Sequence, residues 1–238
     1  MKKILFALLL SVGISSCKTE IKTPATQKKE PVKGVIAENA MVVSAREEAS
    51  KIGVEILQKG GNAFDAMVAT EMALAVAYPV AGNLGGGGFM VYRLANGETG
   101  ALDYREKAPL AATKTMYQDE NGEVIEGKSR LGALAVGVPG SVAGIFAVHE
   151  KFGSLPMEEI LKPVIALARN GYVLTENDSR GLDWARDLFI EVNNDSILFA
   201  QKFNAGDTLK NAALAETLER IFQNGRKEFY EGYTARKL

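Results

Sequence analysis

The chain has 238 residues, of which 47% are hydrophobic and 24% are charged, a composition typical of a globular domain with a substantial core. Its 28 basic and 29 acidic side chains nearly cancel, which argues against electrostatic binding of nucleic acid. With one cysteine and one histidine, these residues hold no intrachain disulfide framework and no metal site built from several Cys or His ligands.

The N-terminus has the features of an export signal. Two lysines precede an apolar stretch over residues 4–10, which is too short for a membrane span of about 20 residues. The sequence Ile-Ser-Ser-Cys at residues 14–17 resembles the lipobox of bacterial lipoproteins, in which the cysteine becomes the lipid-carrying N-terminus. We therefore expect a lipoprotein signal peptide over residues 1–16 and a lipid on Cys17. A plain signal peptide with an incidental cysteine is the alternative.

A lipobox implies an exported bacterial protein, anchored to the cell membrane or the outer membrane and facing the periplasm or the cell surface. Residues 17–34 are rich in Lys, Thr, Pro and Glu, which is typical of a solvated tether. We expect the folded part to span residues 35–238.

The folded part is expected to begin with a strand and a helix. Apolar residues 40–43 predict a short buried strand. Ser44 and Glu47 have the spacing of a capping box, and apolar residues recurring every three or four positions continue a helix to Gly60.

A second helix is predicted from Asn62, with Asp65 in its first turn. It ends at Tyr78, since Pro79 disfavours helical angles in the residue before it. Nearly all of its residues are apolar, so we expect it to be buried.

Four consecutive glycines at 85–88 follow, then two strands at 89–93 and 99–104 joined by the hairpin turn Asn96-Gly97. The tract precedes a strand and lacks a Gly-Lys-Ser/Thr sequence, so it is neither a phosphate-binding loop nor a dinucleotide fingerprint. We expect it to serve close backbone approach or positive-φ geometry, the alternative being a tight crossover between helix and strand.

The remaining pattern predicts a strand at 133–138 and helices at 141–152, 156–170, 175–190 and 211–224, with a kink at Pro163. The last residues resemble the opening of a further helix. His149, late in the 141–152 helix, receives no catalytic role, because no Ser or Asp is placed with it.

Arg105 lies in the sequence Asp-Tyr-Arg-Glu at the end of the second hairpin strand. A guanidinium there can bind a carboxylate through two parallel N–H bonds. From residue types alone, a surface ion pair with Asp103 or Glu106 is the favoured interpretation.

Six motifs together resemble the gamma-glutamyltransferase (glutathione hydrolase) family over about residues 35–238. They are GVEILQKGGNA at 53–63, AGNLGGGGFM at 81–90, DYREKAP at 103–109, GVPGSVAG at 137–144, LARNG at 167–171 and the segment 224–232. The match is to the N-terminal part of that family's large subunit. The resemblance implies an α/β (α+β) fold, a helix-rich and incomplete part of the αββα sandwich of N-terminal nucleophile hydrolases.

The resemblance also implies the chemistry. A precursor cleaves itself, and the new N-terminal Thr of the small subunit attacks the gamma-glutamyl amide of a donor such as glutathione. The glutamyl group passes to water or to an amino acid or peptide acceptor, without a cofactor or a metal. In the family, the arginine that corresponds to Arg105 binds the donor's α-carboxylate, which reverses the preference for a surface ion pair.

No region of these residues resembles the small subunit, so no catalytic residue is assigned and Gly85–Gly88 is not assigned to the oxyanion hole. We expect a truncated segment that is inactive alone and needs the small subunit as its partner. Two other functions remain open: a related acylase acting on cephalosporins or poly-gamma-glutamate, and a non-catalytic lipoprotein that binds glutamyl compounds.

Overall fold

The computed structural model describes residues 34–193 and 197–238. The predicted signal peptide, Cys17 and nearly all of the predicted tether therefore lie outside the described residues. The chain divides into two units, residues 1–38 and 39–238. Residues 34–38 of the first unit are exposed and form no helix or strand. All further description concerns the second unit.

Helix α2 (Ala63–Ala77) begins at the predicted residue. The Asn62 side chain accepts hydrogen bonds from the backbone N–H groups of Phe64 and Asp65 at 2.8 and 3.1 Å. The Asp65 carboxylate in turn accepts from the Asn62 N–H at 2.9 Å, completing a capping box. Asp65 is fully buried and also accepts hydrogen bonds from the backbone N–H and the hydroxyl of Ser154, which ties the start of α2 to a segment 89 residues further along the chain.

Helix α1 (Glu47–Gln58) starts differently from the prediction. The predicted capping box of Ser44 and Glu47 is wrong, since Arg46 occupies the N-cap position and no side chain caps the helix. The Ser44 hydroxyl lies too far before the first turn and instead bonds the Arg46 carbonyl and the Ser50 hydroxyl, each at 2.8 Å.

The predicted strand at residues 40–43 is also wrong. The segment forms no strand and lies along a cleft of about 510 Å³ whose other walls come from α1 and α2. Apolar residues of this kind form a strand only where a neighbouring strand supplies hydrogen-bond partners. None of the described strands pairs with residues 40–43.

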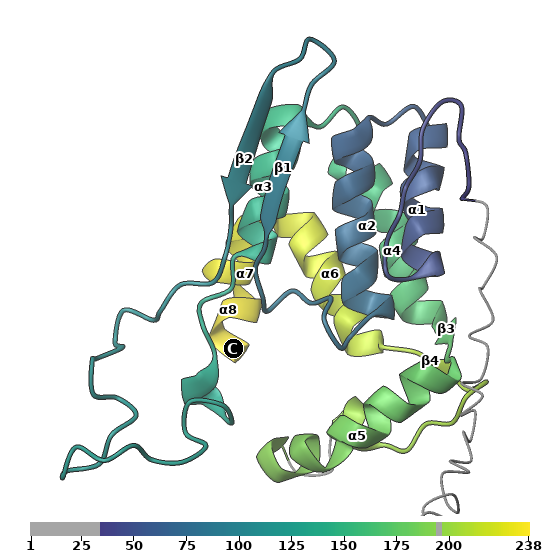
Figure 1. Cartoon of the computed structure of the whole chain (residues 1–238). Coiled ribbons are helices and arrows are strands. Elements are labelled where there is room, and N and C mark those ends of the chain that lie inside the picture. The colour runs from purple at the N-terminus through teal and green to yellow at the C-terminus, as the bar shows by residue number, and fades with distance from the viewer. Residues whose placement is uncertain (1–33, 194–196) are drawn as a thin grey trace, which may run out of the picture. The chain divides into compact units, whose positions relative to one another are not determined.

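Helices α3 (Ser141–Phe152), α4 (Met157–Asn170) and α6 (Ala212–Asn224) complete the core. Helix α2 packs against α1, α3 and α4, and α4 packs against α6 (Figure 1). The prediction that α2 is buried is confirmed, since ten of its residues are buried. Its fully buried positions include Val68, Ala69, Ala73 and Ala77.

Strands β1 (Phe89–Arg93) and β2 (Thr99–Asp103) form the predicted antiparallel hairpin, with Phe89 opposite Asp103. The Tyr92 ring packs on Phe64 of α2 and Phe152 of α3, with ring centroids 5.8 and 4.9 Å apart. This aromatic contact fixes the hairpin beside the helices and so fixes the place where β2 ends.

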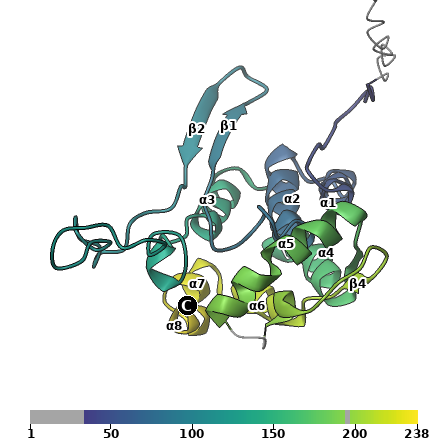
Figure 2. The same cartoon turned by 60° about the horizontal axis from the view of Figure 1, so that its bottom comes forward.

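The segment between β2 and α3 extends away from the helices in both views (Figures 1 and 2). The predicted strand at 133–138 is wrong. Ala133–Ala135 forms a 3-10 helix, η1, and only Val138 makes an isolated bridge, with Lys107. Gly132 precedes η1 with a φ of +81°, a turn conformation that interrupts an extended strand.

A second two-stranded sheet pairs β3 (Tyr172–Val173) with β4 (Thr208–Leu209). Between them lie α5 (Glu176–Asn193), which runs past the predicted end at residue 190, and the 3-10 helix η2 (Leu198–Ala200). The chain finishes with α7 (Arg226–Tyr230) and α8 (Tyr233–Lys237).

The predicted α+β class is confirmed. The described residues contain helices and two small sheets rather than two stacked sheets, so they represent the expected sandwich only in part. No helix within residues 34–193 and 197–238 combines the length and apolar character needed to cross a bilayer.

Candidate functional site

Arg105 lies in the turn that leaves β2, with its side chain 69% exposed. The Asp103 carboxylate accepts a hydrogen bond from the backbone N–H of Arg105 at 2.9 Å and forms no ion pair with its guanidinium. The Glu106 carboxylate lies 3.9 Å from Arg105 Nε, at the limit of an ion pair. The guanidinium is therefore held loosely and keeps donors available for a carboxylate ligand.

The glycine tract packs against the backbone of this turn. A Cβ atom at Gly87 would lie 2.7 Å from Glu106 N and 2.8 Å from Arg105 Cα. None of Gly85–Gly88 has a positive φ, so close approach, rather than unusual backbone angles, explains Gly87 and Gly88, whereas a Cβ atom at Gly85 would meet nothing within 4 Å. The predicted crossover from helix to strand is also present, since the tract joins α2 to β1.

Two further glycines complete the enclosure of the turn. A Cβ atom at Gly140, just before α3, would overlap the Tyr104 carbonyl, and one at Gly144 would overlap the Tyr104 ring. The backbone N–H of Gly140 donates to the Gly86 carbonyl at 2.7 Å, which joins the tract to the start of α3. We call Gly87, Gly88, Gly140 and Gly144 the glycine cradle.

Tyr104 fills this cradle and reaches α2. Its hydroxyl donates to the Glu71 carboxylate, with oxygen–oxygen distances of 3.1 and 3.3 Å. Burial raises the pKa of Glu71 above its usual range, although the hydrogen bond from Tyr104 works in the opposite direction. Burial and the neighbouring Glu71 carboxylate raise the pKa of Tyr104, so the phenol stays protonated and donates near neutral pH.

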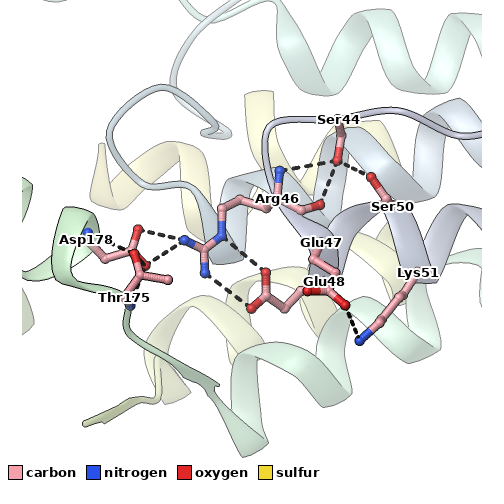
Figure 3. Close-up of polar contacts among 8 residues, drawn as sticks. All are labelled: Ser44, Arg46, Glu47, Glu48, Ser50, Lys51, Thr175 and Asp178. Carbon is pink, nitrogen blue, oxygen red and sulfur yellow. Dashed lines mark hydrogen bonds and ion pairs between the residues drawn. The ribbon is translucent and has the colours of Figure 1, made fainter. Parts of the chain in front are cut away.

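A separate polar cluster joins α1 to α5. The Arg46 guanidinium donates to both carboxylate oxygens of Asp178, at 2.7 and 2.6 Å, and to Glu48 (Figure 3). The side chains of Arg46 and Asp178 are only 10% and 16% exposed. Arg46 also lies 5.3 Å from the centre of the Tyr172 ring. With its donors engaged by two carboxylates, Arg46 serves to hold these elements together.

The pKa of Asp178 is lowered. Burial acts to raise it, but hydrogen bonds from Thr175 and Arg46 and the charge of Arg46 outweigh that effect. The Asp178 carboxylate therefore contributes stability in its ionised form.

The other candidates do not join Arg105. His149 Nε2 lies 2.8 Å from the Leu155 carbonyl, which marks it as a structural residue at the end of α3. Cys17 lies outside the described residues. In the part of the chain that the structure describes, no three His, Cys, Asp or Glu side chains are placed to hold a metal ion.

The sequence profile of the family described as gamma-glutamyltranspeptidase matches residues 49–238. The chain belongs to the gamma-glutamyltranspeptidase family. The glutathione hydrolase proenzyme of Pseudomonas sp. (strain A14) is 49% identical over 207 residues, which are 85% of this chain and 36% of that protein. The Escherichia coli K12 glutathione hydrolase proenzyme is 38% identical, over 100% of this chain and 42% of that protein.

Solved structures agree with this membership. The gamma-glutamyltranspeptidase of Helicobacter pylori matches with a TM-score of 0.81 and 42% identity, over 87% of this chain and 60% of that one. A cephalosporin acylase from Bacillus halodurans matches with a TM-score of 0.70 but only 23% identity, which shows a shared fold alone. The resemblance to the gamma-glutamyltranspeptidase family is therefore confirmed.

The chain spans 36% and 42% of the length of the two curated relatives described above. The sequence interpretation found Arg105 and the glycine tract but missed Glu71. It included Gly140 and Gly144 in a family motif without predicting their contact with Tyr104. The one signal for Glu71 is that it is an acid in the middle of a helix whose other residues, apart from Asp65 and Thr70, are apolar.

Proposed function

We propose that this chain forms the N-terminal part of the large subunit of a gamma-glutamyltransferase that cleaves the gamma-glutamyl amide of glutathione. The support is the family membership and the 49% identity to a glutathione hydrolase proenzyme. The glutamyl group passes first to the Thr hydroxyl of the small subunit, with release of the amine, and then to water or to an amino acid or peptide acceptor.

Arg105 is proposed to bind the α-carboxylate of the glutamyl donor. The observation that carries this assignment is an exposed guanidinium whose nearest carboxylate is 3.9 Å away, on a turn enclosed by glycines. Two parallel N–H bonds set both the place and the direction of the glutamyl group, which brings its gamma-carbonyl to the nucleophile.

The activity is tested with a completed enzyme, which we define as this chain followed by the C-terminal remainder of the Pseudomonas sp. proenzyme. Release of glutamate from glutathione, with a product split into two subunits, supports the proposal. A completed enzyme that is processed but cleaves only a cephalosporin side chain or poly-gamma-glutamate contradicts the substrate assignment. The 238-residue chain alone is the negative control and is expected to release no glutamate.

The role of Arg105 is tested in the same enzyme with Arg105→Lys, which keeps the charge but loses the two-pronged geometry. Loss of hydrogen bonds to a charged group lowers kcat/KM by roughly 10- to 150-fold. A donor without the α-carboxylate is expected to be poor with the unaltered enzyme and to lose little more with the variant. Equal loss with both donors would make Arg105 a structural residue.

Lipid anchoring at Cys17 is a separate proposal, supported by the lipobox-like residues 14–17 and the polar stretch after them. The protein would then face the periplasm or the cell surface. Labelling with a fatty-acid analogue in a bacterial host should mark the unaltered chain and leave Cys17→Ser unlabelled. An exported, soluble and unlabelled product would refute the anchor.

A further inference from the structure

Tyr104, the residue before Arg105, is held at its backbone, ring and hydroxyl. Its N–H donates to the Gly88 carbonyl at 3.0 Å, which extends the pairing of the hairpin by one residue. Its ring lies against Gly144 so closely that a Cβ atom there would overlap it. Its hydroxyl donates to the Glu71 carboxylate on the middle of α2. Tyr104 therefore has one defined position relative to α2 and α3.

Arg105 contrasts with its neighbour. Its backbone is fixed by the N–H bond to Asp103 and by Gly87, whereas its side chain is 69% exposed and contacts Glu106 only loosely. A ligand-binding group is more effective when its base is rigid and only its head responds to the ligand. Here Tyr104 provides the rigid base, and its hydroxyl is held in place by the Glu71 carboxylate.

We infer that Glu71 and Tyr104 form a positioning pair that holds Arg105 in the geometry that binds the donor's α-carboxylate. This inference rests on the proposed function. The Glu71 carboxylate accepts a hydrogen bond from Tyr104, and among the described residues no ion pair joins it to the Arg105 guanidinium. Glu71 and Tyr104 are therefore positioning residues rather than catalytic residues.

A purely structural role makes a different prediction. If the hydrogen bond between Tyr104 and Glu71 only ties the hairpin to α2, its loss lowers stability and changes the kinetics with all donors alike. If it positions Arg105, its loss affects only donors that carry an α-carboxylate, and it raises KM more than it lowers kcat.

The experiment uses the completed enzyme with Tyr104→Phe, Glu71→Ala and Glu71→Gln, assayed with a glutamyl donor and with its analogue lacking the α-carboxylate. Tyr117→Phe is the matched control, because the Tyr117 hydroxyl also donates one hydrogen bond, at 2.8 Å to the Leu134 carbonyl in the exposed segment before α3. Separation into two subunits confirms that each variant folds.

Tyr104→Phe and Glu71→Ala are expected to raise KM for the carboxylate donor about threefold to tenfold, the range that one hydrogen bond contributes. The analogue should be nearly unaffected. Glu71→Gln keeps a carbonyl acceptor for the Tyr104 hydroxyl and should restore most of the loss. Tyr117→Phe should leave both donors unchanged.

The outcomes separate the two claims. Equal effects of Tyr104→Phe on both donors overturn the positioning role, whatever Arg105→Lys does. If Arg105→Lys impairs only the donor that carries the α-carboxylate, but Tyr104→Phe and Glu71→Ala show no such selective effect, the proposed function stands and the positioning role of the pair is overturned. If Tyr104→Phe and Glu71→Ala impair only the donor that carries the α-carboxylate, but Arg105→Lys impairs both donors equally, the assignment of Arg105 is overturned. The inference as stated then falls with it.

Discussion

Gly87→Ala perturbs the turn that carries Arg105 without changing any charge. The added Cβ atom would meet Glu106 N and the Tyr104 carbonyl oxygen at 2.7 Å and Arg105 Cα at 2.8 Å. All three are backbone atoms, so no flexible side chain can move aside. The tract or the turn must shift instead. Gly85→Ala is the matched control, because a Cβ atom there meets nothing within 4 Å and its φ is not positive.

Overpacking of this kind costs about 1–3 kcal/mol. For a domain of this size, 1 kcal/mol lowers the melting temperature by about 2–4 °C, so Gly87→Ala should melt roughly 2–12 °C below the unaltered chain. Gly85→Ala should be neutral or slightly stabilising, since it removes freedom from the unfolded chain.

The assay is thermal unfolding of the 238-residue chain and of its two variants, followed by circular dichroism. In the completed enzyme, Gly87→Ala should also raise KM for glutathione, because the base of Arg105 is displaced. Equal melting temperatures for the two variants would refute the argument that Gly87 is required for close approach to the turn.

Three further predictions concern stability, each measured by urea unfolding of the chain. Arg46→Met should lower the free energy of unfolding by about 1.5–3 kcal/mol, since it removes charge-assisted hydrogen bonds to Asp178, whose side chain is only 16% exposed. By contrast, Lys51→Ala breaks an ion pair with Glu47 whose side chains are 73% and 76% exposed, and it should cost under about 0.5 kcal/mol. The pKa of Asp178 is lowered from 3.8, so its ionised carboxylate contributes fully to the free energy of unfolding above about pH 4, and this contribution is lost as the pH falls through the folded-state pKa. Asp178→Asn should therefore lose less stability than the unaltered chain as the pH falls below about 4. Asp65→Ala should lower the free energy of unfolding by roughly 2–4 kcal/mol, because it removes part of the capping box and leaves the Ser154 donors unpaired. A decrease below about 0.5 kcal/mol would contradict the role of that capping box.

Local sequence signals predicted the elements whose causes are themselves local. Asn62 and Asp65 gave the start of α2, and Pro79 gave its end, because capping and the restriction before proline act within a few residues. The Asn96-Gly97 turn gave the hairpin, and Gly97 indeed has a φ of +90°.

The errors fall where structure depends on distant partners. Residues 40–43 and 133–138 have strand-like composition, but strand formation also requires a neighbouring strand, which none of the described residues provides in full. Ser44 has the spacing of a cap, yet the helix starts later, where Arg46 bonds to Asp178, 132 residues away in the sequence.

The site was predicted in the same uneven way. Arg105 and the glycine tract could be found because their residue types are unusual at those positions. Glu71 could not be given a role from sequence, since its partner Tyr104 lies 33 residues further along the chain. Gly140 and Gly144 likewise acquire meaning only once Tyr104 is placed against them.

The most direct test of the account is a structure of the completed enzyme with a gamma-glutamyl donor or glutamate bound. The account predicts that the α-carboxylate lies against the Arg105 guanidinium with two N–H···O distances of about 2.7–2.9 Å, and that Tyr104 still donates to Glu71. A bound glutamyl group whose α-carboxylate is held by other residues, with Arg105 still beside Glu106, would contradict it.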